Sequence, residues 1–525
     1  MNLVVFASRP SDYVEMTDLA DALALRGHAV ALLYCYSEEA RATHASVLAD
    51  IAARKAAHGR PAVEALDLDR IGRPDDQAPA SAANDGVGQA VFGQPQPVSA
   101  EAGLKRVVAW LRRRRLLQPR HSALRRFVYR VMSALDAIRD PNREVRREAI
   151  GTARFYRRSV VFFRRVLVER ACDAALIPED IVGYLWPVIV KAAHLEGLPA
   201  LVFPYTVANQ QEALQSLRDQ DAFQTANNRL AAERHPRWRL REAGVDLVRL
   251  PSAHIFAHEW IRIAPPDPWM MNSGYSDRIC VDSAFSLDYF HSSGIPLEQM
   301  EVVGSVSQDH MFGLRRDKAA HLATLRRDLG LSGDKPVLLL SGCPNQLTSN
   351  VPYCEFADFE SIATFVGEAL APLTADYHLV VRPHPNFPEF GALLERHGFV
   401  STMIPTSRLV PLSSLFVAFA SATIRWAIAC AVPTVNYDVF HYGYADFASA
   451  AGVVSVDEKN QFMSTVRALG PKTVRYAELL AGSHVDSERW SVMDGRGIDR
   501  IEAAIRQTRA LRAGATTATL ESRSA

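Results

Sequence analysis

Two basic side chains follow an apolar run in the second half of the chain. The run, residues 377–381, has the composition of a buried strand, and Arg382, Pro383, His384 and Pro385 come next. Open parallel α/β sheets bind ligands at the carboxyl ends of their strands. A guanidinium group and an imidazole N–H at such an end would hold a monophosphate or a diphosphate. The alternative is a strand ended by proline, with a solvated histidine beside it.

Two hydroxyl side chains stand roughly one β-α unit further along. Ser421 and Thr423 follow the apolar residues 415–418, and the pattern predicts a helix over residues 421–431. Serine is a favoured N-cap, and the free N–H groups at a helix start bind phosphate. Capping without any ligand is the alternative. Because both motifs follow strands, we interpret them as parts of one phosphate pocket.

Two carboxylates in the first half are candidates for a general base. Glu179 and Asp180 follow the apolar residues 174–177 and precede Gly183, which would let the chain approach a ligand. A carboxylate at a strand end is able to remove a proton from a substrate hydroxyl. The alternative is that both acids stabilise a helix start through its dipole.

Three further positions complete the candidate site. Gly342 and Asp438 end or follow strands of the second half, where such sheets bind ligands, and we expect both to lie at the binding site. Trp269, in a proline-rich segment, is assigned to acceptor binding. No His/Cys cluster or aspartate pair has the spacing of metal ligands. We therefore expect no metal and no cofactor, with cationic side chains and helix N-termini neutralising a leaving phosphate.

A repeated strand-helix-strand order positions these residues. Residues 3–7 and 29–34 are apolar runs, and residues 13–26 between them have apolar side chains at helical spacing, with Gly27 ending the helix. The same alternation returns after residue 335, which predicts an α/β fold with parallel sheets. Since 525 residues exceed one hydrophobic core, we expect two Rossmann-like domains facing a cleft.

The predicted domains are residues 1–310 on the acceptor side and residues 311–512 on the donor side, followed by a disordered tail, 513–525. Within the first domain, the segments 254–256, 278–281 and 300–303 predict additional strands.

A basic segment interrupts the first domain. Residues 71–100 are rich in glycine and proline and predict a flexible loop. Residues 101–170 contain 20 Lys and Arg against 6 Asp and Glu. Their basic and apolar residues alternate as in amphipathic helices, so residues 71–170 are interpreted as an insertion with a cationic face. Ion pairs with the acidic remainder, an anionic membrane and an anionic glycan are the candidate partners, and no nucleic-acid motif is present.

Three motifs together resemble those of GT-B glycosyltransferases. Residues 23–30 are similar to the L-x-x-R-G-H-x-V run of their first helix, and His384-Pro385 with Ser421 and Thr423 resemble the HP and S/T motifs of one subset. That subset includes bacterial sialyltransferases, polysialyltransferases, capsule Kdo transferases and CDP-glycerol transferases. The resemblance implies donor contacts by His384, Ser421 and Thr423, and it favours a CMP-linked nonulosonate donor.

The same resemblance bears on two acidic segments. Asp438 lies in a segment similar to one in surface-polysaccharide transferases. Glu179 and Asp180 resemble the acidic motif of the sialyltransferases, although two residues separate them from Gly183 here.

The resemblance implies a glycosyltransferase with a nucleotide-sugar donor and a glycan or lipid-linked acceptor. A nucleotide-sugar 2-epimerase, a CDP-glycerol-type phosphotransferase and a non-catalytic binding module are the alternatives. The first residues lack the basic start of a signal peptide, and no apolar run reaches about 18 residues. We expect a cytoplasmic protein, with the basic segment as a candidate for peripheral contact with the inner face of a membrane.

Overall fold

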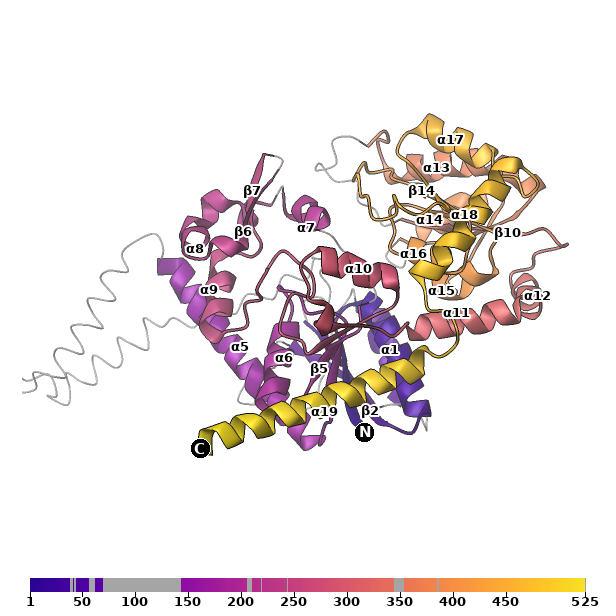
Figure 1. Cartoon of the computed structure of the whole chain (residues 1–525). Helices are drawn as coiled ribbons and strands as arrows, with labels where there is room; N and C mark the ends of the chain where they lie inside the picture. Colours follow the sequence, from indigo (N-terminus) through magenta and orange to yellow (C-terminus); the bar gives the residue numbers. More distant parts are fainter. Residues whose placement is uncertain are drawn as a thin grey trace, which may run out of the picture.

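The chain forms two parallel sheets, each covered by helices on both faces (Figure 1). The computed structural model describes residues 1–37, 41, 44–55, 62–68, 143–204, 210–218, 220–242, 244–343, 354–384 and 387–524. Pro385 and residues 71–142 of the predicted insertion lie outside this set. The first sheet has seven strands in the order β3-β2-β1-β4-β5-β8-β9. They are β1 (Asn2–Ala7), β2 (Ala29–Tyr36), β3 (Ala62–Asp67), β4 (Ala174–Ile177), β5 (Ala200–Val202), β8 (Arg278–Val281) and β9 (Met300–Val302).

The second sheet has six strands in the order β12-β11-β10-β13-β14-β15. All of its neighbouring strands pair in parallel. The prediction of an α/β fold with two Rossmann-like parallel sheets is confirmed. The strands are β10 (Val337–Ser341), β11 (His378–Arg382), β12 (Phe399–Ser401), β13 (Leu415–Ala418), β14 (Thr434–Tyr437) and β15 (Val453–Val456).

Helices separate most successive strands in both domains, although β14 leads directly into β15 and β6 into β7. Those of the first domain and its connection to the second are α1 (Pro10–Leu25), α2 (Ala45–Lys55), α5 (Arg143–Glu169), α6 (Trp186–Leu195), α7 (Gln210–Leu217), α8 (Arg229–Arg234), α9 (Ser252–Ile261), α10 (Ala284–Ser292), α11 (Val306–Arg316) and α12 (Lys318–Asp328). The remaining helices are α13 (Phe359–Leu370), α14 (Glu389–Glu395), α15 (Thr406–Leu409), α16 (Ile424–Ala429), α17 (Lys459–Arg467), α18 (Val474–Trp490) and α19 (Gly497–Ser524). A short antiparallel hairpin, β6 (Arg239–Glu242) and β7 (Val245–Val248), projects from the first domain (Figure 1).

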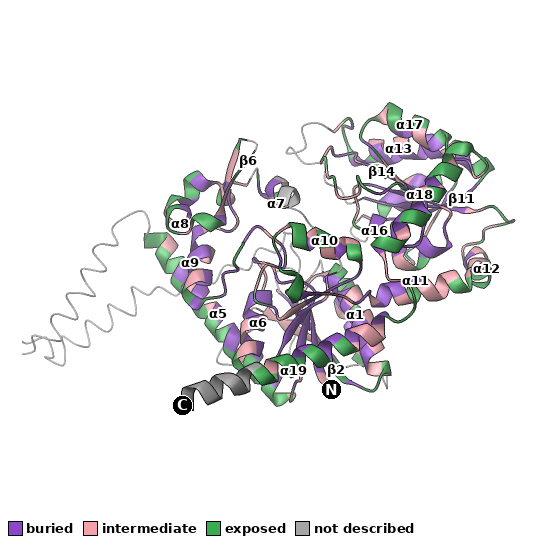
Figure 2. Cartoon of the chain, in the orientation of Figure 1, coloured by how far each residue is buried: buried purple, intermediate pink, exposed green. Residues whose placement is uncertain are grey.

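The strands are buried on both faces, which explains their continuous apolar sequences. All four residues of β4 and all five of β10 are buried. Figure 2 shows the strands of the first sheet mostly in the colour of buried residues. Side chains of one face of β1, such as Phe6, pack with α5 and α6, and those of the other face, such as Val5, pack with α1 and α19. Such two-sided burial fixes the strands and therefore the loops at their carboxyl ends.

The last part of the predicted insertion is a core element of the first domain. α5 lies between β3 and β4 in the chain, and its buried face includes Tyr156, Phe163 and Leu167, which pack in the core beneath the sheet. α5 is thus the crossover helix that a parallel β3-to-β4 connection in the same sheet requires. The prediction that residues 71–170 are all insertion was wrong for the α5 residues.

Two other predicted elements differ in the structure. Residues 254–256 belong to α9 rather than to a strand. The last helix, α19, returns to the first domain, where Ile501, Ala504 and Ile505 enter its core. Assigning residues up to 512 to the second domain was therefore wrong for α19. The helix also continues to Ser524, where we predicted a disordered tail.

Ion pairs hold α19 along the first domain. Arg512 Nη1 lies 2.5 Å from Asp277 Oδ1, and Arg509 Nη2 lies 2.6 Å from Asp173 Oδ1. α11 connects the two domains, because its Val306 packs in the first core and its Met311 in the second. In the described part of the chain, none of the helices combines the length and apolarity needed to cross a bilayer.

Candidate functional site

The ends of β10 and β11 lie in direct contact. Gly342 N donates to Arg382 O at 2.8 Å. A Cβ on Gly342 would lie 3.0 Å from Pro383 Cα and 3.1 Å from His384 N. These distances are tighter than ordinary packing, so a glycine is needed where the chain passes the Pro383-His384 backbone. Gly342, Arg382 and His384 are therefore brought together, as the sequence predicts.

Burial changes the electrostatics of the two basic side chains. Burial, together with the adjacent Arg382, lowers the pKa of His384 to about 4, so the imidazole is neutral at pH 7. Burial also lowers the pKa of Arg382, whose Nη1 donates to Pro383 O at 2.6 Å while its Nε is buried without a hydrogen-bond partner. His384 thus offers a neutral N–H, and the positive charge at this edge belongs to Arg382.

Ser421 and Thr423 form a hydroxyl pair after β13. Their oxygens lie 2.9 Å apart, and Thr423 N donates to Ser421 Oγ at 3.3 Å. α16 begins only at Ile424, so the prediction that Ser421 starts the helix was wrong. The preceding Ala420 has φ +45°, an uncommon conformation for a residue with a Cβ. Asn436 Oδ1 holds it by accepting from Ala420 N at 2.8 Å. The turn that presents the hydroxyl pair is therefore held from β14.

Asp438 shapes the loop after β14. Its carboxylate accepts from Tyr442 N at 2.9 Å and from Gly443 N at 2.7 Å. Within that loop His441 has φ +52°, and its Nε2 is buried without a hydrogen-bond partner. Strained residues with buried polar atoms are typical of functional loops. Sequence reasoning missed His441, because no pattern indicates a positive φ at a histidine.

The carboxylate of Glu179 lies in a buried ion pair. Arg9 Nη2 lies 2.6 Å from Glu179 Oε2, and Arg9 Nε lies 2.8 Å from Asp12 Oδ1. The Arg9 guanidinium also covers the Tyr184 ring at 5.1 Å. Arg9 follows β1 and Glu179 follows β4, which are neighbours in the first sheet. Glu179 is thus neutralised by an arginine that the sequence did not indicate.

Asp180 has a different environment. Its side chain is 2% exposed, and burial raises its pKa to about 6, although hydrogen bonds from Ser276 oppose the shift. Ser276 N donates to Asp180 Oδ2 at 2.9 Å, while Oδ1 is buried and has no hydrogen-bond partner among the described residues. A Cβ on Gly274 would fall within 2.2 Å of the carboxylate, so only glycine fits there. A pKa of about 6 suits a general base near neutral pH, which favours Asp180 for that role.

Trp269 is placed in the core rather than on an open surface. It is 5% exposed, and its Nε1 donates to Trp238 O at 3.1 Å. The ring therefore packs beneath the hairpin residues, including Leu247, and presents no face to an acceptor in this arrangement.

The two domains meet beside the hydroxyl pair. Arg425 Nη1, on α16, lies 3.2 Å from Asp282 Oδ2 at the end of β8, and both side chains are 9% exposed. A cavity of about 10 Å³, enough for one water molecule, lies at this junction and is also lined by Phe285, Ala422 and Trp490. The ion pair links the helix that carries the hydroxyl pair to the first sheet.

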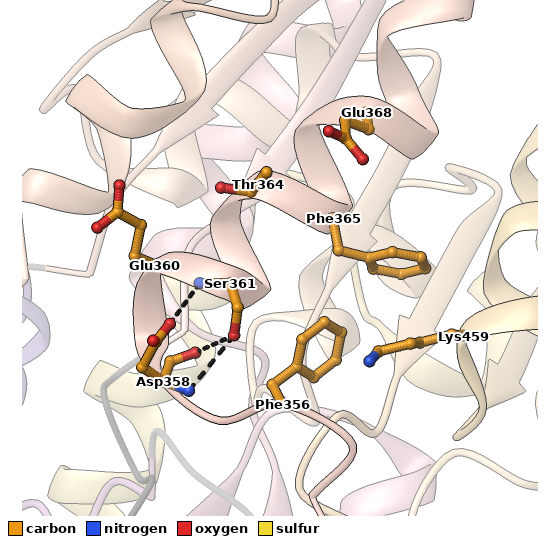
Figure 3. A pocket seen from close by; sticks show the side chains of 8 residues that line it. All are labelled: Phe356, Asp358, Glu360, Ser361, Thr364, Phe365, Glu368 and Lys459. Carbon is orange, nitrogen blue, oxygen red and sulfur yellow. Dashed lines mark hydrogen bonds between the residues drawn. The ribbon is translucent and has the colours of Figure 1, made fainter.

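A larger hollow lies away from these residues. It has a volume of about 500 Å³ and lies at the starts of α13 and α17, where Lys459 Nζ is 4.0 Å from the centre of the Phe356 ring (Figure 3). None of the predicted site residues lines it. Within the described residues, no group of three or more His, Cys, Asp and Glu side chains is placed to hold a metal ion.

Comparisons with known proteins give structural similarity only. No family model and no curated protein sequence matches the chain. A UDP-GlcNAc 2-epimerase from Neisseria meningitidis bound to UDP-GlcNAc has 12% identity and a TM-score of 0.47, covering 97% of this chain and 100% of its own. UGT73P12 from Glycyrrhiza uralensis, complexed with glycyrrhetinic acid 3-O-monoglucuronide, has 11% identity and a TM-score of 0.48, covering 100% and 99%. The wall teichoic acid polymerase TagF has 12% identity and a TM-score of 0.42, covering 65% and 74%. Similarity at this level carries no conclusion about activity.

Proposed function

We propose that this protein is a glycosyltransferase that moves a sugar from a nucleotide-activated donor to a surface-polysaccharide or glycolipid acceptor. The supporting observation is the strand order β11-β10-β13-β14 in the second sheet. This order lines up His384, Gly342, Ser421 and Asp438 at four neighbouring carboxyl ends. Nucleotides bind at such an edge in open parallel sheets.

The nucleotide-sugar site proposed in the second domain combines one cation with neutral groups that donate hydrogen bonds. The His384 N–H and the two hydroxyls donate to phosphate oxygens, and Arg382 supplies a positive charge. As the glycosidic bond breaks, negative charge develops on the leaving nucleotide, and preorganised donors stabilise it. We infer that these groups act without a metal ion. The HP and S/T motifs favour a CMP-linked nonulosonate as the donor.

In the first domain, Asp180 is proposed as the base of an inverting transfer. It would accept the proton of the acceptor hydroxyl as that oxygen attacks the anomeric carbon. With a pKa of about 6, the carboxylate is ionised at pH 7 and is more basic than an ordinary aspartate. Glu179, paired with Arg9, is proposed to position the neighbouring loop.

A calorimetric screen with CMP, CDP, UDP and GDP tests this function. We expect one nucleotide to bind with a dissociation constant of about 1 μM to 1 mM, the usual range for enzyme substrates. The matching nucleotide-sugar is then expected to be hydrolysed slowly and transferred when an acceptor is added. Conversion of UDP-GlcNAc without acceptor would instead indicate a 2-epimerase, and binding without hydrolysis a non-catalytic module. Failure of all four nucleotides to bind would contradict the proposal.

The outer face of α5 is proposed to contact an anionic membrane that carries the acceptor. All eight of its arginines are exposed, and Ile150, Val161 and Val168 are exposed among them. Only Arg164 and Arg165 of α5 form ion pairs with carboxylates in the described part of the chain. Basic side chains interleaved with apolar ones are typical of helices that lie on anionic lipid. Each arginine near such a surface contributes about 1 kcal/mol, reduced by salt.

Co-sedimentation with liposomes tests this contact. We expect binding to vesicles that contain phosphatidylserine and little binding to phosphatidylcholine alone. Replacing Arg154, Arg157 and Arg158 with glutamine is expected to weaken binding about tenfold or more, because three surface charges are lost. The control replaces three exposed arginines of the second domain, Arg316, Arg327 and Arg396, and should bind as the native protein does. Equal binding to both vesicle types, or none at low salt, would rule the contact out.

A further inference from the structure

Arg249 lies between β7 and α9, near the candidate base. Its backbone N donates to Trp238 O at 2.9 Å, and its guanidinium carbon is 6.0 Å from the centre of the Trp269 ring. The next residue, Leu250, lies against the turn at Gly183, within 3.8 Å of where a Cβ would stand. Arg249 is therefore beside the loop that follows Glu179 and Asp180.

The Arg249 guanidinium has no counter-ion in the described part of the chain. It forms no ion pair and no side-chain hydrogen bond there, and its Nε is fully buried. Burial accordingly lowers its pKa, with the Tyr184 phenol as the opposing influence. Buried charges in proteins are normally paired, because an unpaired charge loses its hydration without compensation. Arg249 as a residue is only partly buried, and Nε is the one nitrogen of its guanidinium that is fully buried without a partner among the described residues.

The neighbouring arginine shows the contrast. Arg9 also lies against Tyr184, but Glu179 and Asp12 neutralise it. Of these two arginines, Arg9 is neutralised within the chain, whereas Arg249 has no counter-ion among the described residues. A guanidinium group offers paired N–H donors that match the two oxygens of a carboxylate or a phosphate.

We propose that Arg249 binds an anionic group of the acceptor, a carboxylate or a phosphate, beside the Asp180 loop. This inference rests on the proposed transferase function, in which the first domain holds the acceptor. The bound anion supplies the missing counter-ion and orients the acceptor relative to the base. The site therefore selects acidic glycans or phosphorylated acceptors over neutral ones.

Calorimetric titration with inorganic phosphate and with glucuronate tests the site, with glucose as the neutral comparison. We expect Arg249→Leu to weaken binding of at least one anion tenfold or more. Arg249→Lys keeps the charge but loses the paired N–H donors of the guanidinium group, so it is expected to weaken anion binding severalfold. Arg241→Leu is the matched control: it removes an exposed arginine from the adjacent hairpin, and anion affinity should stay unchanged. The anion that depends more strongly on Arg249 identifies the acceptor chemistry.

Thermal unfolding in anion-poor buffer provides a second measurement. Arg249→Leu is expected to unfold at the same temperature as the native protein or higher, because it removes an uncompensated charge. A lower unfolding temperature, or anion affinities equal to those of the native protein, would overturn the proposal. If the native protein binds anions through Arg249 but binds no nucleotide, the transferase function fails and the anion site stands. If the protein binds a nucleotide but Arg249→Leu leaves anion binding unchanged, the transferase function stands and the anion site fails.

Discussion

Replacing His384 with alanine is expected to weaken nucleotide binding about 5- to 150-fold, and replacing Ser421 and Thr423 together is expected to do the same. A hydrogen bond to a charged phosphate contributes about 1–3 kcal/mol, which sets this range. The imidazole is expected to act as a neutral donor, since burial beside Arg382 lowers its pKa to about 4. Isothermal titration calorimetry with the nucleotide identified by the screen measures the loss.

Matched variants separate a binding defect from a folding defect. His484→Ala and Ser464→Ala remove exposed side chains of the same types from α18 and α17. Both are expected to keep native affinity. All variants should show the native circular dichroism spectrum, because the hydroxyl pair and His384 lie in loops outside the core strands. Native affinity in both the histidine and the hydroxyl variants would remove the donor site from this edge of the second sheet.

The fold was largely predictable from local patterns. Strands such as β1 and β10 are apolar except at one end because both of their faces are buried, and this leaves a nearly continuous signal in the sequence. The helices between them have apolar residues at helical spacing. Parallel pairing then follows from the strand-helix-strand order, which places Arg382, His384, Ser421 and Glu179 at sheet ends.

Other elements were not predictable because their local sequences fit two structures. The triplet at 254–256 has two apolar residues after a histidine, and such a short run does not distinguish a strand from part of a buried helix. The alternating basic and apolar residues of α5 correctly predicted an amphipathic helix. They did not reveal that the apolar face packs on the first sheet, which depends on contacts with α6 and α9.

The parts of the candidate site that the sequence did not predict depend on long-range contacts. Arg9 meets Glu179 across 170 positions of sequence, and Gly274 meets Asp180 across 94. Arg249 was not noticed, because an isolated arginine in a sequence gives no sign of lacking a counter-ion. Trp269 was misassigned for the opposite reason: its proline-rich context suggested a surface, whereas the ring is buried under the hairpin.

Replacing Asp180 with asparagine is expected to lower the rate of sugar transfer about 10²- to 10⁴-fold, the range for loss of a general base. Donor affinity should be retained, because the donor residues lie in the other domain. The native pH–rate profile is expected to rise through an apparent pKa near 6, which is the value that burial gives to Asp180. That rising limb should disappear in the variant. Glu179→Gln is expected to keep the rising limb of the pH–rate profile and to lower the rate only by displacing Arg9.

Asp180→Asn is expected to lower the transfer rate but to raise the stability of the folded protein. The pKa of Asp180 is raised from 3.8 to about 6 on folding, so the folded state binds the proton more tightly than the unfolded state does. This contribution is present below pH 3.8 and is lost as the pH rises through 6, leaving a cost of about 3 kcal/mol at neutral pH. Asparagine carries no charge and its Oδ1 still accepts from Ser276 N, so Asp180→Asn should be more stable than the native protein above pH 6.

Urea unfolding from pH 4 to pH 8 measures this difference, with Asp221→Asn as an exposed control that should follow the native protein. A variant that is slower and yet more stable at pH 8 is the signature of a charge retained for catalysis at a cost in stability. A variant that transfers sugar at the native rate would place the base elsewhere or make the reaction a retaining one.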